Sequence, residues 1–154
     1  MACDRYKNRN YKSAMQFFNT ADQDILATNT VTNPVVVDLG GTVTDTGCAF
    51  DFNARRVQVN TSGLYRFSAN VNIAGITAGL VTVAMTLDGV VLPETLKTVN
   101  IGVAGTERDL QIETIRRLST CCNIEDHNIG IIVYSDGTAV GTVDNVSGNA
   151  LKLA

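Results

Sequence analysis

The sequence has few of the residues from which large aromatic cores and membrane spans are built. Its 154 residues include no tryptophan, and only 6% are aromatic. No stretch approaches the roughly 18 to 20 consecutive apolar residues of a membrane-spanning helix, so no membrane partner is expected. Hydrophobic residues still make up 45% of the chain. A core of this size built from valine, isoleucine, leucine, threonine and alanine favours strands over helices.

Residues that carry catalysis or bind metals are also scarce. A histidine-dependent site would need the single histidine, His127, together with partners from elsewhere in the chain. We expect this histidine to lie in a solvated turn. The sequence has no zinc-ligand spacing, no glycine-rich phosphate loop, no dense calcium loop and no hydrolase or kinase signature. We therefore expect no enzyme, no catalytic residue, no cofactor and no bound metal.

The four cysteines, Cys3, Cys48, Cys121 and Cys122, do not have the spacing of a disulfide framework. Cys121 and Cys122 would point to opposite faces of a strand, which makes a bond between them difficult. We expect all four cysteines to be reduced. On a strand, Cys121 and Cys122 are better explained as core or interface thiols than as nucleophiles.

The first twelve residues differ in charge from the rest of the chain. Four basic residues against one acidic residue give them a net charge of +3, which leaves −6 for the remainder of a chain of net charge −3. The acidic body argues against nucleic-acid binding. We predict that residues 1–13 form an arm, either a disordered tail or a segment that docks on a partner protein. Its candidate attachment residues are Arg5, Tyr6, Lys7, Arg9, Tyr11 and Lys12.

The same segment lacks the apolar stretch of a secretion signal. We therefore expect a protein made in a cytoplasm and either kept there or carried on a larger particle. Two further basic pairs, Arg55-Arg56 and Arg116-Arg117, are expected on solvated strand faces or in ion pairs between subunits with Glu113 or Asp109.

The clearest structural pattern lies between Phe50 and Ile73. Val57 and Val59 alternate with polar residues, and a short Asn-Thr-Ser-Gly turn follows. After this turn the apolar positions again fall on every second residue: Tyr65, Phe67, Ala69, Val71 and Ile73. Because side chains alternate between the two faces of a strand, both runs bury one face. We predict a hairpin that covers a hydrophobic core.

Other strands are expected along the rest of the chain. The segments with strand patterns are residues 14–19, 35–39, 48–52, 80–87, 90–92, 129–134 and 149–154. Asp88-Gly89 predicts a tight hairpin turn, since both residues tolerate positive φ, and Pro93 should end the pairing that follows it. Residues 21–33 are expected to form a loop or an irregular edge.

The segment 106–120 has two possible structures. Thr106 and Asp109 fit a helix-capping box, and a helical face would contain Leu110, Thr114, Ile115 and Leu118. A period of two instead places Leu110, Ile112, Thr114 and Leu118 on one face, interrupted only by Arg116. We choose the strand because the surrounding segments are all strands.

Eight to ten short strands with frequent turns and no convincing helix are typical of a two-sheet antiparallel sandwich or jelly roll. The sequence shows no internal repeat and no linker. We therefore predict a single all-β domain over residues 14–154, preceded by the arm.

The stretch FDFNARRVQVNTSGLYRFSANVNI resembles the central signature of C1q/TNF-like domains. That signature has a Phe-Asp pair, a loop with glycine and a Gly-x-Tyr-x-Phe-Ser strand, represented here by Phe50, Asp51, Gly63, Tyr65, Phe67 and Ser68. VTVAMTLDGVVL is similar to the next hairpin of the family. TIRRLSTCCNIEDHNIGIIVYS is similar to its late strand pair, which is joined by an acidic turn, and VSGNALKLA stands where its final strand lies.

The resemblance implies a ten-stranded jelly roll that assembles as a homotrimer, with Phe50, Gly63, Tyr65 and Phe67 in the core and trimer scaffold. No collagen-like stalk precedes the domain, and an alanine and a leucine replace the usual aromatic residue near the last strand. The resemblance therefore favours the bacterial and phage members of the family over secreted animal proteins. Such modules occur in phage particles and on bacterial spores.

Two functions remain open from the sequence. The first is a non-enzymatic capsid decoration or head-fibre protein, made in a bacterial cytoplasm and attached to the virion surface through its arm. The second is a module on a bacterial spore or cell surface that binds a glycan or receptor through the loops 75–79 and 135–138.

Overall fold

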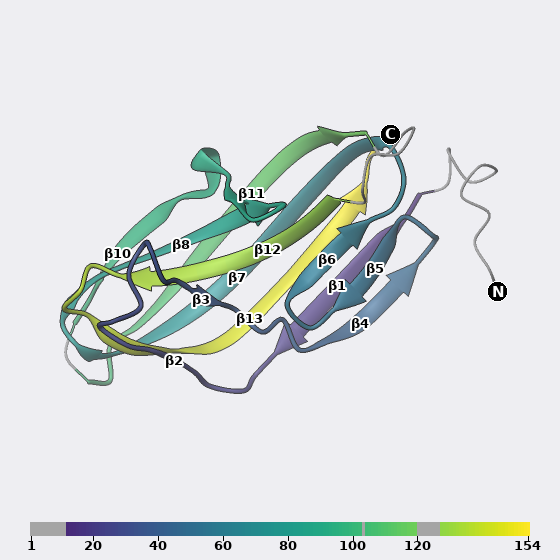
Figure 1. The fold of residues 1–154 in the computed structure, drawn as a ribbon. Coiled ribbons are helices and arrows are strands. Elements are labelled where there is room, and N and C mark those ends of the chain that lie inside the picture. The colour runs from purple at the N-terminus through teal and green to yellow at the C-terminus, as the bar shows by residue number, and fades with distance from the viewer. Residues whose placement is uncertain (1–11, 103, 120–126) are drawn as a thin grey trace.

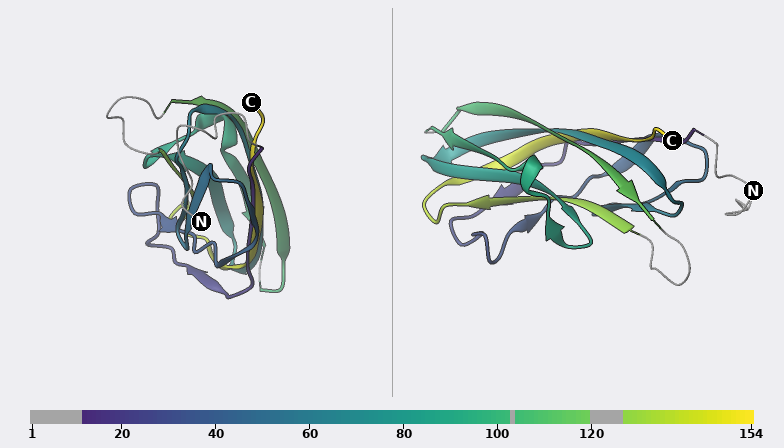
Figure 2. Two further views of the ribbon diagram at one scale, coloured as in Figure 1. Left: turned by 90° about the vertical axis from the view of Figure 1, so that its right-hand side faces the viewer. Right: turned by 90° about the horizontal axis from the view of Figure 1, so that it is seen from above.

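The computed structural model describes residues 12–102, 104–119 and 127–154. These residues form two antiparallel sheets that pack face to face as an elongated sandwich (Figures 1 and 2). Each sheet has five strands in its linear order. Three further short strands, β2, β3 and β9, each pair with one strand of these sheets. The prediction of a ten-stranded antiparallel jelly roll is confirmed.

Sheet A has the strand order β11-β7-β13-β1-β4, with β2 paired to β13. Its strands are β1 (Ala14–Asn19), β2 (Gln23–Ile25), β4 (Gly41–Thr46), β7 (Gly63–Thr77), β11 (Glu107–Leu118) and β13 (Val140–Lys152). Strand β7, next to the edge strand β11, pairs along most of its length with β11 on one side and with β13 on the other.

Sheet B has the strand order β10-β8-β12-β6-β5, with β3 paired to β12 and β9 paired to β8. Its strands are β3 (Val35–Val36), β5 (Phe50–Asn53), β6 (Arg56–Val59), β8 (Gly79–Leu87), β9 (Val90–Val91), β10 (Lys97–Ile101) and β12 (His127–Ser135). A short 3-10 helix, η1 (Pro93–Thr95), connects β9 to β10.

The core fills the space between the sheets and is built mainly from alternate residues of the central strands. On β7 the inward residues Tyr65, Phe67, Ala69, Val71 and Ile73 are all at most 3% exposed. Inward residues of β8 and β12 face them from sheet B: Val81, Val83, Met85, Ile129, Ile131 and Val133. The period-two pattern therefore predicted the inward face of these strands correctly.

The predicted hairpin between residues 57–59 and 65–73 is wrong. β6 pairs with β5 and β12 in sheet B, whereas β7 lies in sheet A, so residues 60–62 cross from one sheet to the other. The real hairpin on this side is β5–β6. Alternation specifies which face of a strand is buried, but either sheet of a sandwich can bury it. The Asp88-Gly89 hairpin is confirmed, with φ of 52° and 82° and with β8 paired to β9.

Residues 107–118 form a strand, as predicted, and the helical alternative is wrong. Their expected pairing with residues 129–134 is also wrong, because β11 pairs with β7 in sheet A and β12 pairs in sheet B. Arg116 does not disturb the strand. It lies on the same side of β11 as the buried Leu110 and Ile112, and its guanidinium forms an ion pair with Glu94 of η1.

The last strand is longer than predicted. β13 begins at Val140 rather than at residue 149, and its register against β7 shifts between Val143 and Asn145. This bulge and the glycine, asparagine and serine residues around it hide the strand from a period-two search. β10 was not predicted, and β2 lies inside a segment predicted as a loop or an irregular edge.

The expectation that all four cysteines are reduced is wrong for Cys48, which is disulfide-bonded. The other three cysteines lie outside the described residues. Spacing along the chain did not reveal the bond, because a disulfide requires only that the two sulfur atoms meet in the folded chain.

Candidate functional site

The four predicted scaffold residues lie at the junction between the sheets. Phe50, Tyr65 and Phe67 are at most 4% exposed, and the Tyr65 ring stacks on Phe67 and meets Phe50 edge to face. The Tyr65 hydroxyl donates to the Thr61 carbonyl oxygen at 2.6 Å, and burial raises the pKa of this phenol. A Cβ on Gly63 would collide with the carbonyl oxygen of Ala154, so only glycine fits here. Whether these residues also support a trimer stays a prediction.

Most of the predicted attachment arm, from Arg5 to Tyr11, lies outside the described residues. Lys12 is exposed. The next residue, Ser13, is 3% exposed and is held at both ends: its hydroxyl accepts from the Ala49 N–H at 3.2 Å and its carbonyl from the Lys152 N–H at 2.9 Å. The chain therefore enters the fold at a fixed point, beside the C-terminal strand β13 (Figure 1).

The two loops considered for glycan binding meet at one end of the sandwich. Gly79 lies so close to Thr138 and Ala139 that a Cβ would be 2.6 Å from the Thr138 hydroxyl. The Asp136 carboxylate accepts from the N–H groups of Leu80, Thr138 and Ala139. These hydrogen bonds hold the pKa of Asp136 far below its usual value. The carboxylate therefore holds the two loops together through hydrogen bonds. Glycan binding by these loops stays a prediction.

The outward face of sheet A is almost free of charge at its centre. A shallow hollow of about 350 Å³ lies there, over β1, β7 and β13. Its polar side chains are all small or uncharged: Gln16, Ser68, Asn70, Gln111, Ser147 and Asn149. Two apolar side chains stand at the rim of the hollow, Phe18 at 48% and Val43 at 67% exposure.

Two acidic side chains on this face, Glu113 and Asp109 of β11, have partners within the chain. The Arg66 guanidinium contacts the Glu113 carboxylate at 2.7 Å, and Asn72 donates to the Asp109 carboxylate at 2.9 Å. The suggested partners of the arginine pairs are therefore already occupied in the single chain, by Arg66 and Asn72. The uncharged centre of sheet A is left as a surface that a second protein chain could cover without desolvating an ion.

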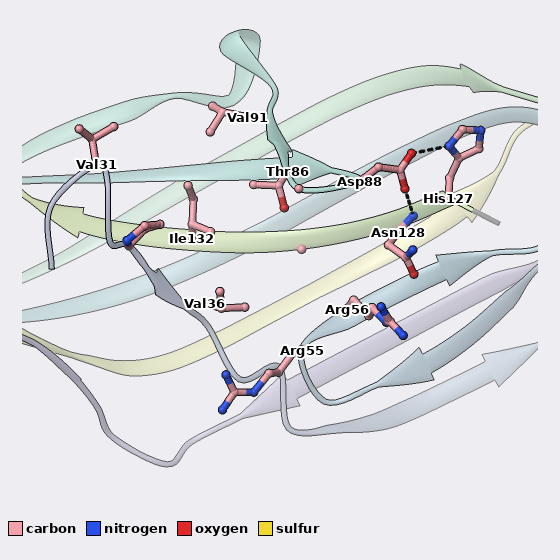
Figure 3. Close-up of a pocket in the computed structure, with 13 residues that line it drawn as sticks. Val31, Val36, Arg55, Arg56, Thr86, Asp88, Val91, His127, Asn128 and Ile132 are labelled. Atoms are coloured by element: carbon pink, nitrogen blue, oxygen red, sulfur yellow. Dashed lines mark hydrogen bonds and ion pairs between the residues drawn. The ribbon is translucent and has the colours of Figure 1, made fainter. Parts of the chain in front are cut away.

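The outward face of sheet B contains a larger groove, with a volume of about 940 Å³ (Figure 3). Its floor is formed by Thr86 of β8 and by Gly130 and Ile132 of β12. The loop before β3 supplies one wall, and the β8–β9 turn supplies the other. Apolar residues Val31, Val36 and Ile132 gather at one end, whereas Arg55 and Arg56 come from the β5–β6 turn (Figure 3).

Asp88 and His127 lie together beside this groove. The Asp88 carboxylate contacts His127 Nδ1 at 2.7 Å and accepts from the Asn128 N–H at 2.7 Å (Figure 3). His127 Nε2 lies 2.9 Å from the Ser119 carbonyl oxygen. The predicted solvated turn is therefore wrong, because the histidine begins β12 and both ring nitrogens are engaged.

Within residues 12–102, 104–119 and 127–154, no group of three histidine, cysteine, aspartate or glutamate side chains could hold a metal ion. The described part of the chain also has no helix long and apolar enough to cross a membrane. Sequence reasoning missed both the groove and the uncharged face. The Arg55-Arg56 pair was visible, but nothing along the chain indicated that it would meet the segments around Val31 and Ile132.

No protein-family model matches the chain, and no curated protein matches its sequence. Several solved structures have the same fold. Murine APRIL aligns at 13% identity with a TM-score of 0.61, covering 93% of this chain and 100% of that one. The globular domain of zebrafish complement 1qA aligns at 8% identity with a TM-score of 0.54, covering 89% of this chain and 94% of that one.

The vertex protein P5 of PRD1 aligns at 13% identity with a TM-score of 0.55. The alignment covers 92% of this chain and 73% of that chain. At these identities the likeness concerns the fold alone. The chain therefore has a TNF/C1q-like jelly-roll fold, as the Gly63 to Ser68 motif suggested.

Proposed function

We propose that this chain is a non-enzymatic structural protein that assembles as a homotrimer through the outward face of sheet A. The observation that carries the proposal is the uncharged, shallow centre of that face, bordered by the exposed side chains of Phe18 and Val43. Solvated faces of antiparallel sheets carry polar residues, and the centres of protein interfaces are depleted of charged ones. Small side chains also allow a second chain to approach closely.

The trimer is displayed on a particle, most concretely as a capsid decoration or head-fibre protein of a phage. The PRD1 vertex protein supports this choice because it has the same fold and belongs to a virus particle. Attachment is assigned to residues 1–12, whose net charge of +3 opposes the −6 of the body. Three arms on one trimer bind far more strongly than one, because the first contact raises the effective concentration of the others. A bacterial spore or cell surface is the alternative location.

A matched pair of substitutions tests the assembly surface. Val43 on sheet A and Val90 on sheet B are 67% and 69% exposed, so either can be replaced by arginine at little cost to the monomer. Light scattering should give the wild type about three times the chain mass of 16.4 kDa. We expect Val43→Arg to dissociate the trimer and Val90→Arg to leave it intact. A monomeric wild type, or equal behaviour of the two variants, would refute assembly through sheet A.

Deletion of residues 2–12 tests the arm separately. The shortened chain should still fold and form trimers, because Ser13 and all the described strands are retained. It should no longer sediment with the particle. Unchanged incorporation would show that attachment uses another surface, without affecting the assembly proposal.

A further inference from the structure

The groove on the outward face of sheet B combines two features that favour a ligand with both apolar and anionic parts. Val31 and Val36 are 63% and 43% exposed, and both line the groove together with the nearly buried Ile132 (Figure 3). Exposed apolar side chains that gather in a concave surface mark interaction sites more often than isolated ones do. The groove is separate from the sheet A face of the proposed trimer.

Arg55 and Arg56 supply the positive charge. Neither guanidinium makes an ion pair or a side-chain hydrogen bond within the described residues. Asp88, an acidic side chain that also lines the groove, contacts His127 and Asn128 and forms no ion pair with either arginine. Two adjacent arginines without an ion pair among the described residues stand out on a body with a net charge of −6, and the guanidinium of either can bind a carboxylate through paired hydrogen bonds.

The register of β12 gives the spacing between the two features. Val36 pairs with Ile132, and Val57 pairs with Ile129, so that Arg56 falls at the level of Gly130. Two residues of a strand span about 6.6 Å. In an extended peptide, side chains two residues apart lie at this same separation and point to the same side.

We infer that this groove binds an extended peptide segment of a partner protein that carries an aliphatic residue and an acidic residue two positions apart. The aliphatic side chain packs on Val31, Val36 and Ile132, and the carboxylate reaches Arg55 and Arg56. Gly130 leaves the floor between them open for the peptide backbone. The groove lining contains no phenylalanine, tyrosine or tryptophan on which a sugar ring could stack, which favours a peptide over a glycan. The basic arm of this chain is not the expected ligand, because its positive charge would be repelled by Arg55 and Arg56.

The test is a titration of the isotopically labelled full chain, followed by the backbone amide resonances of Thr86, Gly130 and Ile132. The probes are capped peptides with the core Val-Thr-Asp or Asp-Thr-Val between Gly-Ser flanks. At least one should shift these resonances saturably, with a dissociation constant on the order of a millimolar. A Val-Thr-Asn core, which lacks the charge, and an adjacent Val-Asp core should bind at least about tenfold more weakly.

Two variants locate the contact. Arg55→Ala together with Arg56→Ala should weaken binding at least about tenfold. Gly130→Val should block it by filling the floor, where a Cβ would already lie 3.1 Å from the Thr86 hydroxyl. The matched control, Arg108→Ala with Arg117→Ala, removes two exposed arginines of β11 in sheet A and should leave the affinity unchanged.

Well-dispersed spectra confirm that each variant is folded. Absence of any shift with both acidic peptides, equal binding of the neutral peptide, or equal loss in the control variant would overturn the inference. Shifts with polygalacturonate but with neither peptide would overturn it in favour of an acidic glycan.

Discussion

The outward faces of the two sheets share one core but expose different chemistry. At the centre of sheet A, small uncharged side chains form a shallow surface, and the neighbouring Glu113 and Asp109 have partners within the chain. On sheet B a loop and two turns rise above the strands and enclose a deeper groove that contains two unpartnered arginines among the described residues. A flat uncharged face suits a copy of the same chain, whereas a charged groove selects a ligand of opposite charge.

The largest expected effect on stability comes from disrupting the hydrophobic core that the two sheets share. Phe67 is 2% exposed and lies between the sheets, so Phe67→Ala should lower the free energy of unfolding by about 3–5 kcal/mol, measured by urea denaturation. Both self-association and peptide binding should decline together. Phe18→Ala is the control, because Phe18 is 48% exposed on sheet A. It should weaken self-association only, and equal destabilisation by the two changes would contradict the shared core.

A smaller effect is expected where the sheet B groove meets the β8–β9 turn. Asp88→Ala removes the acceptor of His127 and of the Asn128 N–H, and it places alanine at a φ of 52°. The free energy of unfolding should fall by about 1–2 kcal/mol. Asp88→Gly also removes the hydrogen bonds but adopts a positive φ without strain. It should therefore lower the free energy of unfolding less than Asp88→Ala does. If glycine restored full stability, the hydrogen bonds would have no energetic role.

The Asp136 carboxylate joins the ends of both sheets and should make stability depend on pH. Its folded pKa is depressed below 3.8 by the N–H donors around it, so its contribution is complete above the unfolded pKa and declines as pH falls below it. Asp136→Asn should therefore be less stable than the wild type at about pH 6.5, and this difference should shrink toward about pH 3. Thermal denaturation at both pH values measures it. A difference that grows in acid would contradict the assignment.

The smallest effect concerns the arginines that distinguish the faces. Arg66→Gln breaks an exposed contact with Glu113 on sheet A and should reduce stability only slightly, with the loss fading in high salt. Arg56→Gln on sheet B breaks no intramolecular contact of the guanidinium with a described residue and should not reduce stability. Denaturation at low and high salt compares the two. A larger loss from Arg56→Gln would show that this arginine has a structural role.

Local patterns predicted local structure well. The alternation from Tyr65 to Ile73 specified which side of β7 faces the core, and Asp88-Gly89 specified the turn between β8 and β9. The pattern failed at β13, where a bulge interrupts the alternation. It also failed for pairing: β6 and β7 are neighbours in the chain but belong to different sheets, since a buried face can be covered from either side of the sandwich.

The candidate surfaces were harder to predict than the strands. The groove on sheet B is assembled from four separated segments, around Val31, Arg55, Asp88 and Ile132, and their convergence depends on the pairing of β12 with β3, β6 and β8. The uncharged face of sheet A depends likewise on the registers of β1, β7 and β13. The arm was predicted from charge alone and stays a prediction, because it lies almost entirely outside the described residues.

The sequence by itself determined that this protein is an all-β domain with a TNF/C1q-like jelly-roll motif, because side-chain period, turn residues and the Gly-x-Tyr-x-Phe-Ser pattern are properties of short segments. The tertiary structure alone decided which strands share a sheet, that Cys48 is disulfide-bonded, and how the two outward faces differ. These features depend on contacts between residues far apart in the chain, and such contacts exist only after the two sheets have closed over their common core.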